Sequence, residues 1–236
     1  MKLKVKKIVP LKEVWIILFL SVFAASLLVK LLLNFFVPIK YFEIIYFPLI
    51  QICMSIGLFY VLRDEYKINF QLCFNAYVEN YKENLKLSIR YFFIFITIFI
   101  SAAVLLWGLY ELMGIDSLGY KSGSSTIKNF FIVDGEFYLT GFIILIFSSC
   151  IIAPILEELM FRRLLFVALR EKFNFVLSLT ISSLIFTIFH LSLIPFFYSM
   201  YLGWVYEKES KLPVNIMLHS FINLFIIFIK GVIIYS

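Results

Sequence analysis

The chain has few cysteines and histidines, and it carries little charge for its length of 236 residues. Its three cysteines, Cys53, Cys73 and Cys150, share no spacing typical of a metal site, so neither a metal cluster nor a disulfide framework is indicated. Charged residues make up 15% of the sequence, and the basic ones are scattered over short segments. The net charge of +6 therefore does not indicate a nucleic-acid partner. The sequence also lacks internal repeats and low-complexity segments.

Apolar residues are abundant instead. They make up 63% of the sequence, against roughly 45–50% in ordinary soluble domains, and the mean hydropathy is +1.00. Several apolar runs reach or approach the ~20 residues that a helix needs to cross a bilayer. The composition therefore predicts an all-α protein, a polytopic transmembrane helical bundle whose surroundings are the lipid bilayer, with no appended soluble module.

We expect about seven spans, of which the sixth is too short to cross alone. Their expected bounds are 14–37, 44–62, 91–110, 137–170, 175–194, 196–206 and 213–234. The first run follows a lysine-rich start, but it is too long for a cleaved signal sequence, so we interpret it as an uncleaved span. Residues 63–90 are expected at the membrane interface. The Gly- and Ser-containing segment 114–135 is expected to form an external loop.

The charges of the short segments predict an orientation. With the N-terminus inside, 16 of the 21 Lys and Arg residues fall in cytoplasmic segments and five fall on the other side. The positive-inside rule therefore favours a cytoplasmic N-terminus. The C-terminal end of span 137–170 then meets the cytoplasmic face.

Two adjacent carboxylates, Glu157 and Glu158, stand within that span. Burying an unpaired carboxylate in hydrocarbon costs several kcal/mol, so the pair needs partners or water. Arg162 lies one helical turn after Glu158 on the same face, whereas Glu157 points about 100° away. This spacing predicts an orienting or structural Glu158–Arg162 pair and a Glu157 that is free to react. A solvated Glu/Arg helix end at the membrane surface is the alternative.

Three further polar residues fall in the late apolar spans. His190 ends one of them, and His219 and Asn223 share a face of the last. A lone intramembrane histidine is often only a hydrogen-bonding group between helices. However, a hairpin that turns at 171–174 places His190 level with Glu157, and the following turns bring His219 and Asn223 to nearly the same depth. This convergence favours a functional site.

These residues form three motifs: Glu157-Glu158-x-x-x-Arg162, Phe186-x-x-x-His190 and His219-x-x-x-Asn223. The motifs resemble the signatures of the CAAX-protease and bacteriocin-processing (CPBP, or Abi) family of intramembrane proteases. The resemblance covers residues 137–225, and the sequence departs from the family at Arg163, where glycine is common. It implies a protease core at 137–236, preceded by a membrane region at 1–136 of a kind that varies within the family.

The resemblance implies an intramembrane endopeptidase that hydrolyses a peptide bond of a membrane-associated peptide or protein. In this interpretation Glu157, with His190, holds and deprotonates the attacking water. His219 and Asn223 both donate to the tetrahedral oxyanion, a contribution of about 3–4 kcal/mol per donor in other proteases.

A zinc-dependent version of the enzyme stays open, with Glu157, Glu158, His190 and His219 as ligands. The sequence has no His-Glu-x-x-His pair, and Asn223 is a poor zinc ligand. The metal-free version is therefore favoured, and no cofactor is expected.

Eukaryotic members of the family process prenylated proteins, whereas bacterial members resemble peptide-maturation or bacteriocin-immunity proteins. The many Phe, Ile, Lys and Tyr residues favour the bacterial branch and a bacterial cell membrane, so a prenylated substrate is not expected. The non-enzyme alternative is a membrane immunity or interaction protein that acts by binding.

Overall fold

The computed structural model describes residues 9–19, 25–36, 39–65, 67–112, 132–133, 136–190 and 193–235. The first half of the described chain forms α1 (Leu11–Phe19), α2 (Ala25–Phe36), α3 (Ile39–Tyr60) with the short π-helical extension η2 (Val61–Glu65), α4 (Phe70–Glu79) and α5 (Tyr81–Leu112). The second half forms α7 (Leu139–Phe147), η4 (Ser148–Ile152), α8 (Ala153–Glu157), η5 (Glu158–Phe166), α9 (Val167–Arg170), α10 (Phe175–His190), α11 (Ile194–Glu209) and α12 (Leu212–Tyr235). The expected helical membrane bundle is confirmed.

The β structure in the described part of the chain is one antiparallel pair, β1 (Ile132–Val133) and β2 (Glu136–Phe137), just before α7. It stands at the end of the segment 114–135 that we expected to be an external loop. The rest of that segment lies outside the described residues, so the loop stays a prediction.

Four helical stretches in the described residues are long and apolar enough to cross a membrane. They are Ile44–Arg63, Tyr81–Leu105, Leu139–Arg170 and Leu212–Gly231. The expected first span, 14–37, corresponds to α1 and α2, which have 9 and 12 residues, and residues 20–24 between them are outside the described part. The count of seven spans is therefore not confirmed.

The expected short sixth span, 196–206, is longer in the structure. Helix α11 has 16 residues. Pro195 lies in its first turn, where the missing backbone N–H of proline costs no hydrogen bond. Ser210 ends the helix in a left-handed conformation with a φ of 52°.

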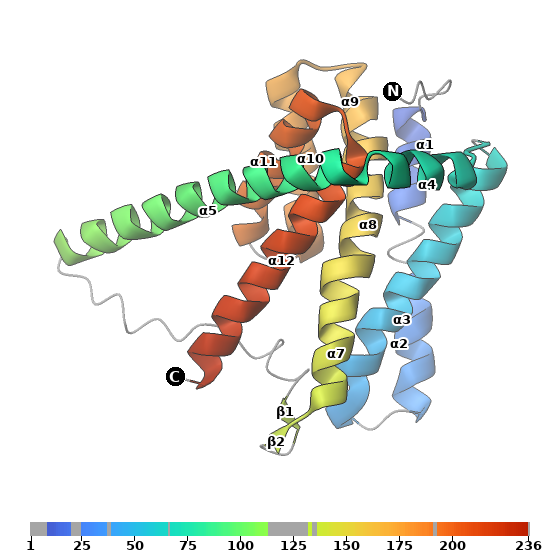
Figure 1. Ribbon diagram of the computed structural model, residues 1–236. Helices are drawn as coiled ribbons and strands as arrows, with labels where there is room; N and C mark the ends of the chain where they lie inside the picture. The colour runs from blue at the N-terminus through green and yellow to red at the C-terminus, as the bar shows by residue number, and fades with distance from the viewer. Residues whose placement is uncertain are drawn as a thin grey trace.

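The stretch Leu139–Arg170 is the central pillar of the fold (Figure 1). Helix α12 runs alongside it, α10 and α11 stand behind, α1 and α3 flank the other side, and α5 crosses over one end of the bundle. Side chains from all these directions meet in one hydrophobic core around the pillar, including Val14, Leu62, Tyr91, Leu156, Leu165, Phe186, Leu202 and Leu218. The pillar therefore has neighbours on several sides, and a polar side chain on it can be reached from three helices.

The pillar is not a regular α-helix throughout. In η4 and η5 the turns are π-helical, with backbone bonds to the carbonyl five residues back, and α8 lies between them. Wide turns of this kind are frequent at functional sites. Glu157 ends α8 and Glu158 begins η5, so the two adjacent glutamates stand where one turn type passes into the other.

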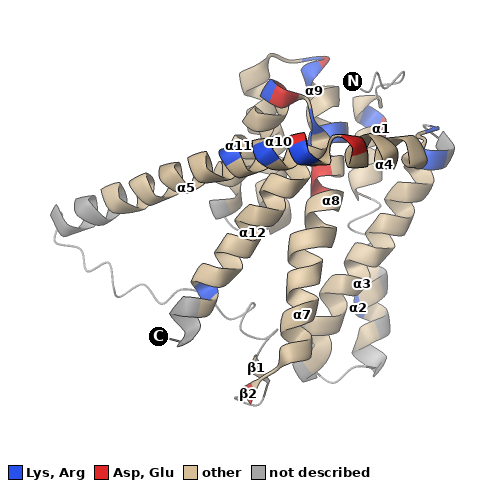
Figure 2. Cartoon of the chain, viewed as in Figure 1, with Lys and Arg blue, Asp and Glu red and all other residues tan. Residues whose placement is uncertain are grey.

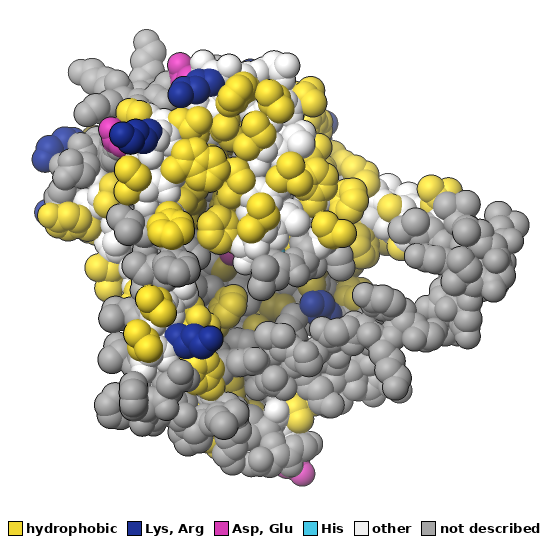
Figure 3. Space-filling model, turned by 180° about the vertical axis from the view of Figure 1, so that it is seen from behind, with side chains coloured by type: hydrophobic (Ala, Val, Ile, Leu, Met, Phe, Trp, Pro, Cys, Tyr) yellow, Lys and Arg dark blue, Asp and Glu magenta, His cyan; other side chains and the backbone are white. Residues whose placement is uncertain are grey.

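Lys and Arg residues gather at the end of the bundle that holds α9 and the start of α1 and α5 (Figure 2). In the view from behind, basic side chains lie at the same end, others lie lower down, and hydrophobic side chains cover much of the described surface between them (Figure 3). This is the end that the charges of the sequence predict to be cytoplasmic, and the orientation stays a prediction.

This orientation predicts a labelling result. In a chain whose three cysteines are replaced by serine, Ser122→Cys should react with a membrane-impermeant maleimide added to intact cells. Lys172→Cys, at the turn after α9, should react only after the membrane is opened. The reverse pattern would contradict the predicted orientation, in which the α9 end of the pillar lies at the cytoplasmic face.

Candidate active site

Glu158 is fully buried, and three donors surround its carboxylate. Arg162 Nε lies 3.2 Å from Oε2, His219 Nδ1 lies 2.9 Å from Oε1, and Asn215 Nδ2 donates to Oε2 at 3.2 Å. The spacing of Glu158 and Arg162 predicted their ion pair, and the structure contains it. Because Glu158 accepts from both α12 residues as well, it joins the pillar to α12.

Arg162 in turn joins the pillar to two other helices. Its Nη2 donates to the backbone oxygen of Ser199 at 3.3 Å and to the Ser199 hydroxyl at 3.2 Å, on α11. Its guanidinium lies 5.1 Å from the centre of the Phe186 ring on α10. The guanidinium and the Glu158 carboxylate together hold four helical segments in one arrangement.

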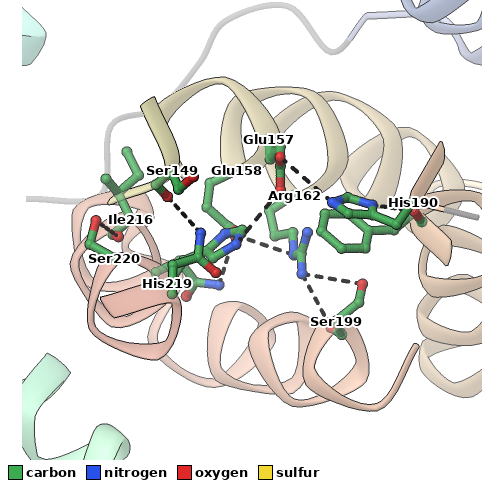
Figure 4. Close-up of polar contacts among 12 residues, drawn as sticks. Ser149, Glu157, Glu158, Arg162, His190, Ser199, Ile216, His219 and Ser220 are labelled. Atoms are coloured by element: carbon green, nitrogen blue, oxygen red, sulfur yellow. Dashed lines mark hydrogen bonds and ion pairs between the residues drawn. The ribbon is translucent and has the colours of Figure 1, made fainter. Parts of the chain in front are cut away.

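Glu157 has a different environment from its neighbour. Its carboxylate is 21% exposed and stands between two imidazoles (Figure 4). Oε1 is 3.8 Å from His190 Nε2, and Oε2 is 3.6 Å from His219 Nε2. Both distances are too long for direct hydrogen bonds. They suit a water molecule that bonds to both the carboxylate and an imidazole. Of the two adjacent glutamates, Glu157 is therefore the one whose surroundings suit a reactive role.

The other nitrogen of each imidazole is held in place. His190 Nδ1 is 2.8 Å from the Phe186 carbonyl, which can only accept, so Nδ1 carries the proton and a neutral His190 turns its Nε2 lone pair toward Glu157. His219 Nδ1 likewise donates to Glu158, and its Nε2 is buried without a hydrogen-bond partner among the described residues. Glu157 is therefore met by two oriented imidazoles.

Aromatic packing fixes the two rings. The His190 ring stacks on Phe186, with centroids 4.3 Å apart, and Phe186 itself is fully buried. Tyr198 of α11 packs edge-on against Phe186 at 5.5 Å and lies 5.7 Å from the His219 ring. These contacts restrict both histidines before any substrate arrives.

Asn223 has a different partner. Its Nδ2 donates at 2.7 Å to the backbone oxygen of Ser149, in η4, two turns before Glu157. The structure thus brings Glu157, His190 and His219 together, with Glu158 and Arg162 beside them. Asn223, which we expected to be the second oxyanion donor, here donates to a backbone carbonyl of the pillar.

Sequence reasoning missed Asn215, Ser199 and Tyr198. A signal for Asn215 existed, because it lies four residues before His219 and so shares its face of α12. No comparable signal marks Ser199 and Tyr198, because their roles depend on how α11 packs against the pillar.

One ligand of the zinc-dependent alternative already has other partners. Glu158, one of the four, accepts from Arg162, His219 and Asn215. Among the described residues, no group of three or more His, Cys, Asp and Glu side chains is placed to hold a metal ion. The metal-free version stays the favoured prediction.

These observations define a class of protein: a helical membrane protein with a carboxylate–histidine site inside its bundle. Residues 139–225 match the family described as Type II CAAX prenyl endopeptidase Rce1-like. Residues 139–225 are therefore similar to the CAAX-protease family, as the three motifs indicated.

Two bacterial relatives are similar to part of the chain. One is YdiL of Bacillus subtilis, named as a candidate membrane peptidase, with 35% identity over 91 residues, which are 37% of this chain and 37% of YdiL. The other is UPF0177 protein YxdF of Lactococcus lactis, with 35% identity over 77 residues, 32% of this chain and 44% of YxdF. The match thus spans less than half of either relative. No solved structure shows a significant match.

Proposed function

We propose that the protein is an intramembrane peptidase that hydrolyses a peptide bond of a membrane-associated peptide or protein. One observation carries the proposal: the Glu157 carboxylate lies between the Nε2 atoms of His190 and His219, each held by its other ring nitrogen. A carboxylate and an oriented imidazole at water-bridging distance are what activation of a hydrolytic water requires. The family match of residues 139–225 supports the same reaction class.

In the proposed reaction, a water molecule hydrogen-bonds to Glu157 and to Nε2 of His190. Glu157 takes one proton, and the hydroxide attacks the carbonyl carbon of the scissile bond. Collapse of the tetrahedral intermediate breaks the C–N bond, and Glu157 returns the proton to the leaving nitrogen. The carboxylate thus acts first as base and then as acid, and no proton is gained or lost over the cycle.

His219 is one of the residues we propose for the oxyanion. Its Nδ1 donates to Glu158, and its Nε2 lies 3.6 Å from Oε2 of Glu157. In the proposed step a proton on Nε2 is donated to the oxyanion, and donors fixed in advance are the largest contribution in many hydrolases. Asn223 donates one of its two amide N–H groups to Ser149, and we propose that the other donates to the oxyanion together with His219.

The surroundings of the site support a substrate that comes from the membrane. Glu157 and His190 are the partly exposed members of the cluster, at 21% and 31%, whereas Glu158 and His219 are buried. The helices behind the pillar present a hydrophobic surface (Figure 3), with exposed apolar residues that include Val176, Leu184, Ile188, Leu193 and Phe197. An apolar peptide segment can lie against such a surface, and prenylation is not needed to bring it there.

We further propose a bacterial setting, in the maturation of a peptide or in self-immunity to a bacteriocin. The two relatives, YdiL and YxdF, are bacterial proteins, which supports the setting without naming a substrate.

The test is cleavage of membrane peptides by the purified protein in lipid nanodiscs, followed by mass spectrometry. Products should form with the wild type and with Val78→Ala, a change at a 54% exposed position of α4, outside the proposed substrate surface. They should be lost with His190→Ala, which removes the imidazole that faces Glu157. If His190→Ala forms the same products at the same rate as Val78→Ala, the proposed site is wrong.

The metal-free reaction makes a separate prediction. Protein that is extensively chelated and shown by metal analysis to be metal-free should keep its full cleavage rate, because Glu157 and His190 hold the water themselves. Loss of cleavage on chelation, restored by stoichiometric Zn²⁺, would establish the zinc-dependent alternative. Inhibition by excess zinc would not distinguish the two versions, since the partly exposed imidazole and carboxylate of the site can bind added zinc whether or not the reaction uses it.

A further inference from the structure

Tyr198 is a buried side chain of the site whose hydroxyl takes no part in the reaction described so far. The residue lies on α11 and is only 9% exposed. Among the described residues its hydroxyl has no hydrogen-bond partner, whereas Tyr201, three residues later, donates to the backbone oxygen of Tyr91 at 2.7 Å. A buried phenol O–H usually finds a partner. The Tyr198 hydroxyl is therefore free to donate to a bound ligand.

The phenol ring is held from three directions. It packs edge-on against Phe186 of α10 at 5.5 Å and lies 5.7 Å from the His219 ring of α12. The next residue, Ser199, accepts from Arg162 of the pillar through its backbone oxygen at 3.3 Å and its hydroxyl at 3.2 Å (Figure 4). The ring is thus fixed against the two helices and the pillar before any substrate arrives.

The hydroxyl stands on the Glu157 side of the charged cluster. Of the charged side chains that act on the phenol, Glu157 has the strongest electrostatic influence, ahead of Arg162 and Glu158. Such an influence falls with distance, so this order places the phenol oxygen toward Glu157. No hydrogen bond between described residues joins the two groups. Like the imidazoles of His190 and His219, the phenol therefore stands near the carboxylate without bonding to it directly.

We propose that Tyr198 is a further catalytic residue, whose O–H donates to the oxygen of the scissile carbonyl as that oxygen becomes negative. A neutral phenol can donate, and an oxyanion has three lone pairs, so it can accept from Tyr198 beside His219 and Asn223. The phenol keeps its proton throughout, and the proton transfers of Glu157 are unchanged. This role rests on the proposed function, whereas the direction of the hydroxyl toward Glu157 does not.

The opposing interpretation is that Tyr198 only packs against Phe186 and His219. Tyr198→Phe separates the two, because it keeps the ring and removes only the hydroxyl. A bond that strengthens in the transition state contributes to kcat and little to KM. A packing role predicts no change in either, since the ring contacts remain.

The experiment compares the wild type, Tyr198→Phe and Tyr201→Phe in lipid nanodiscs with one membrane peptide. Tyr198→Phe should lower kcat by about 100-fold, with little change in KM and an unchanged melting temperature, as expected for loss of one oxyanion donor. Tyr201→Phe makes the same chemical change but removes the bond to the Tyr91 backbone. It should lower the melting temperature and keep kcat.

A second peptide tests the contact to the carbonyl oxygen itself. In this peptide the scissile amide is replaced by a thioamide, whose sulfur is a weaker hydrogen-bond acceptor than oxygen. The loss of kcat caused by Tyr198→Phe should therefore be smaller for the thioamide than for the amide, because the two changes affect one contact. An effect that Tyr198 exerts through another residue would be equal for both peptides.

A measurement without substrate tests the direction of the hydroxyl. The ¹³Cζ signal of Tyr198, identified by its loss in Tyr198→Phe, should shift in Glu157→Gln.

Three results would overturn the proposal: cleavage by Tyr198→Phe at the rate of Tyr201→Phe, an equal loss with amide and thioamide, or a ¹³Cζ signal that ignores Glu157→Gln. If the wild type cleaves no peptide, the proposed function fails, and the ¹³Cζ signal still decides whether the hydroxyl faces Glu157.

Discussion

Replacing Glu157 by glutamine should reduce peptide cleavage at least about 100-fold while leaving the protein folded. The amide keeps the size of the side chain but cannot accept a proton from water at neutral pH. Folding should be spared, because the two imidazoles lie 3.6 and 3.8 Å from the carboxylate, beyond ordinary hydrogen-bond length, and the side chain is partly exposed. Cleavage of a membrane peptide and thermal melting in detergent, measured on the same preparation, check both parts.

Glu207→Gln is the matched control. Glu207 accepts from Arg170 at 3.0 Å on the exposed surface of the bundle, where an ion pair contributes about 0–1 kcal/mol. This variant should cleave and melt like the wild type. If Glu157→Gln cleaves as well as Glu207→Gln, Glu157 is not the base. If Glu157→Gln and His190→Ala both also keep full biological activity, the protein acts as an immunity or interaction protein by binding.

Much of this arrangement could be predicted from helix geometry. The 100° between adjacent residues separates Glu157 from Glu158, and the i, i+4 interval joins Glu158 to Arg162. The hairpin that turns after α9 returns α10 past the pillar, so His190 comes within 3.8 Å of Glu157 from 33 positions away in the sequence. These contacts follow from helical periodicity and from short turns, and both can be read from a single sequence.

The rest of the site and of the fold depends on how the helices pack against one another. The identical i, i+4 interval places His219 beside the glutamates and Asn223 on a backbone carbonyl, because the pillar has wide turns and a proline that a regular helix lacks. The position of α5 across the bundle also depends on packing between helices. Tyr91 OH bonds to Glu209, and Ser88 donates to the backbone oxygen of Val214 at 3.0 Å, contacts that no periodicity of α5 reveals.

The roles of the two adjacent glutamates follow only from sequence spacing and helix packing together, as Glu158 shows. Sequence spacing gives it one partner, but the structure gives it three, two of them from α12. A carboxylate so placed neutralises Arg162, orients His219 and leaves Glu157 as the group with room for water. The distinction between the two adjacent glutamates is thus one of partners, and it should be visible in stability as well as in activity.

Glu158→Gln and Arg162→Ala should therefore each lower the stability of the protein by about 3–5 kcal/mol, because each leaves the other charge buried without its partner. Both side chains are almost inaccessible, at 0% and 2%, so solvent cannot compensate. In the double variant the costs should not add, since residues in contact couple by about 0.5–3 kcal/mol. Melting curves of the two single variants and the double variant measure the coupling.

Glu157→Gln is the control in this series, since it makes the same chemical change one residue earlier. Its melting temperature should be unchanged or raised while its cleavage is lost, whereas Glu158→Gln should melt early. Early melting of Glu157→Gln, together with a stable but inactive Glu158→Gln, would reverse the two roles. Such a result would mean that the three contacts of Glu158 serve the reaction and that the partly exposed Glu157 side chain holds the fold, which their burial and distances argue against.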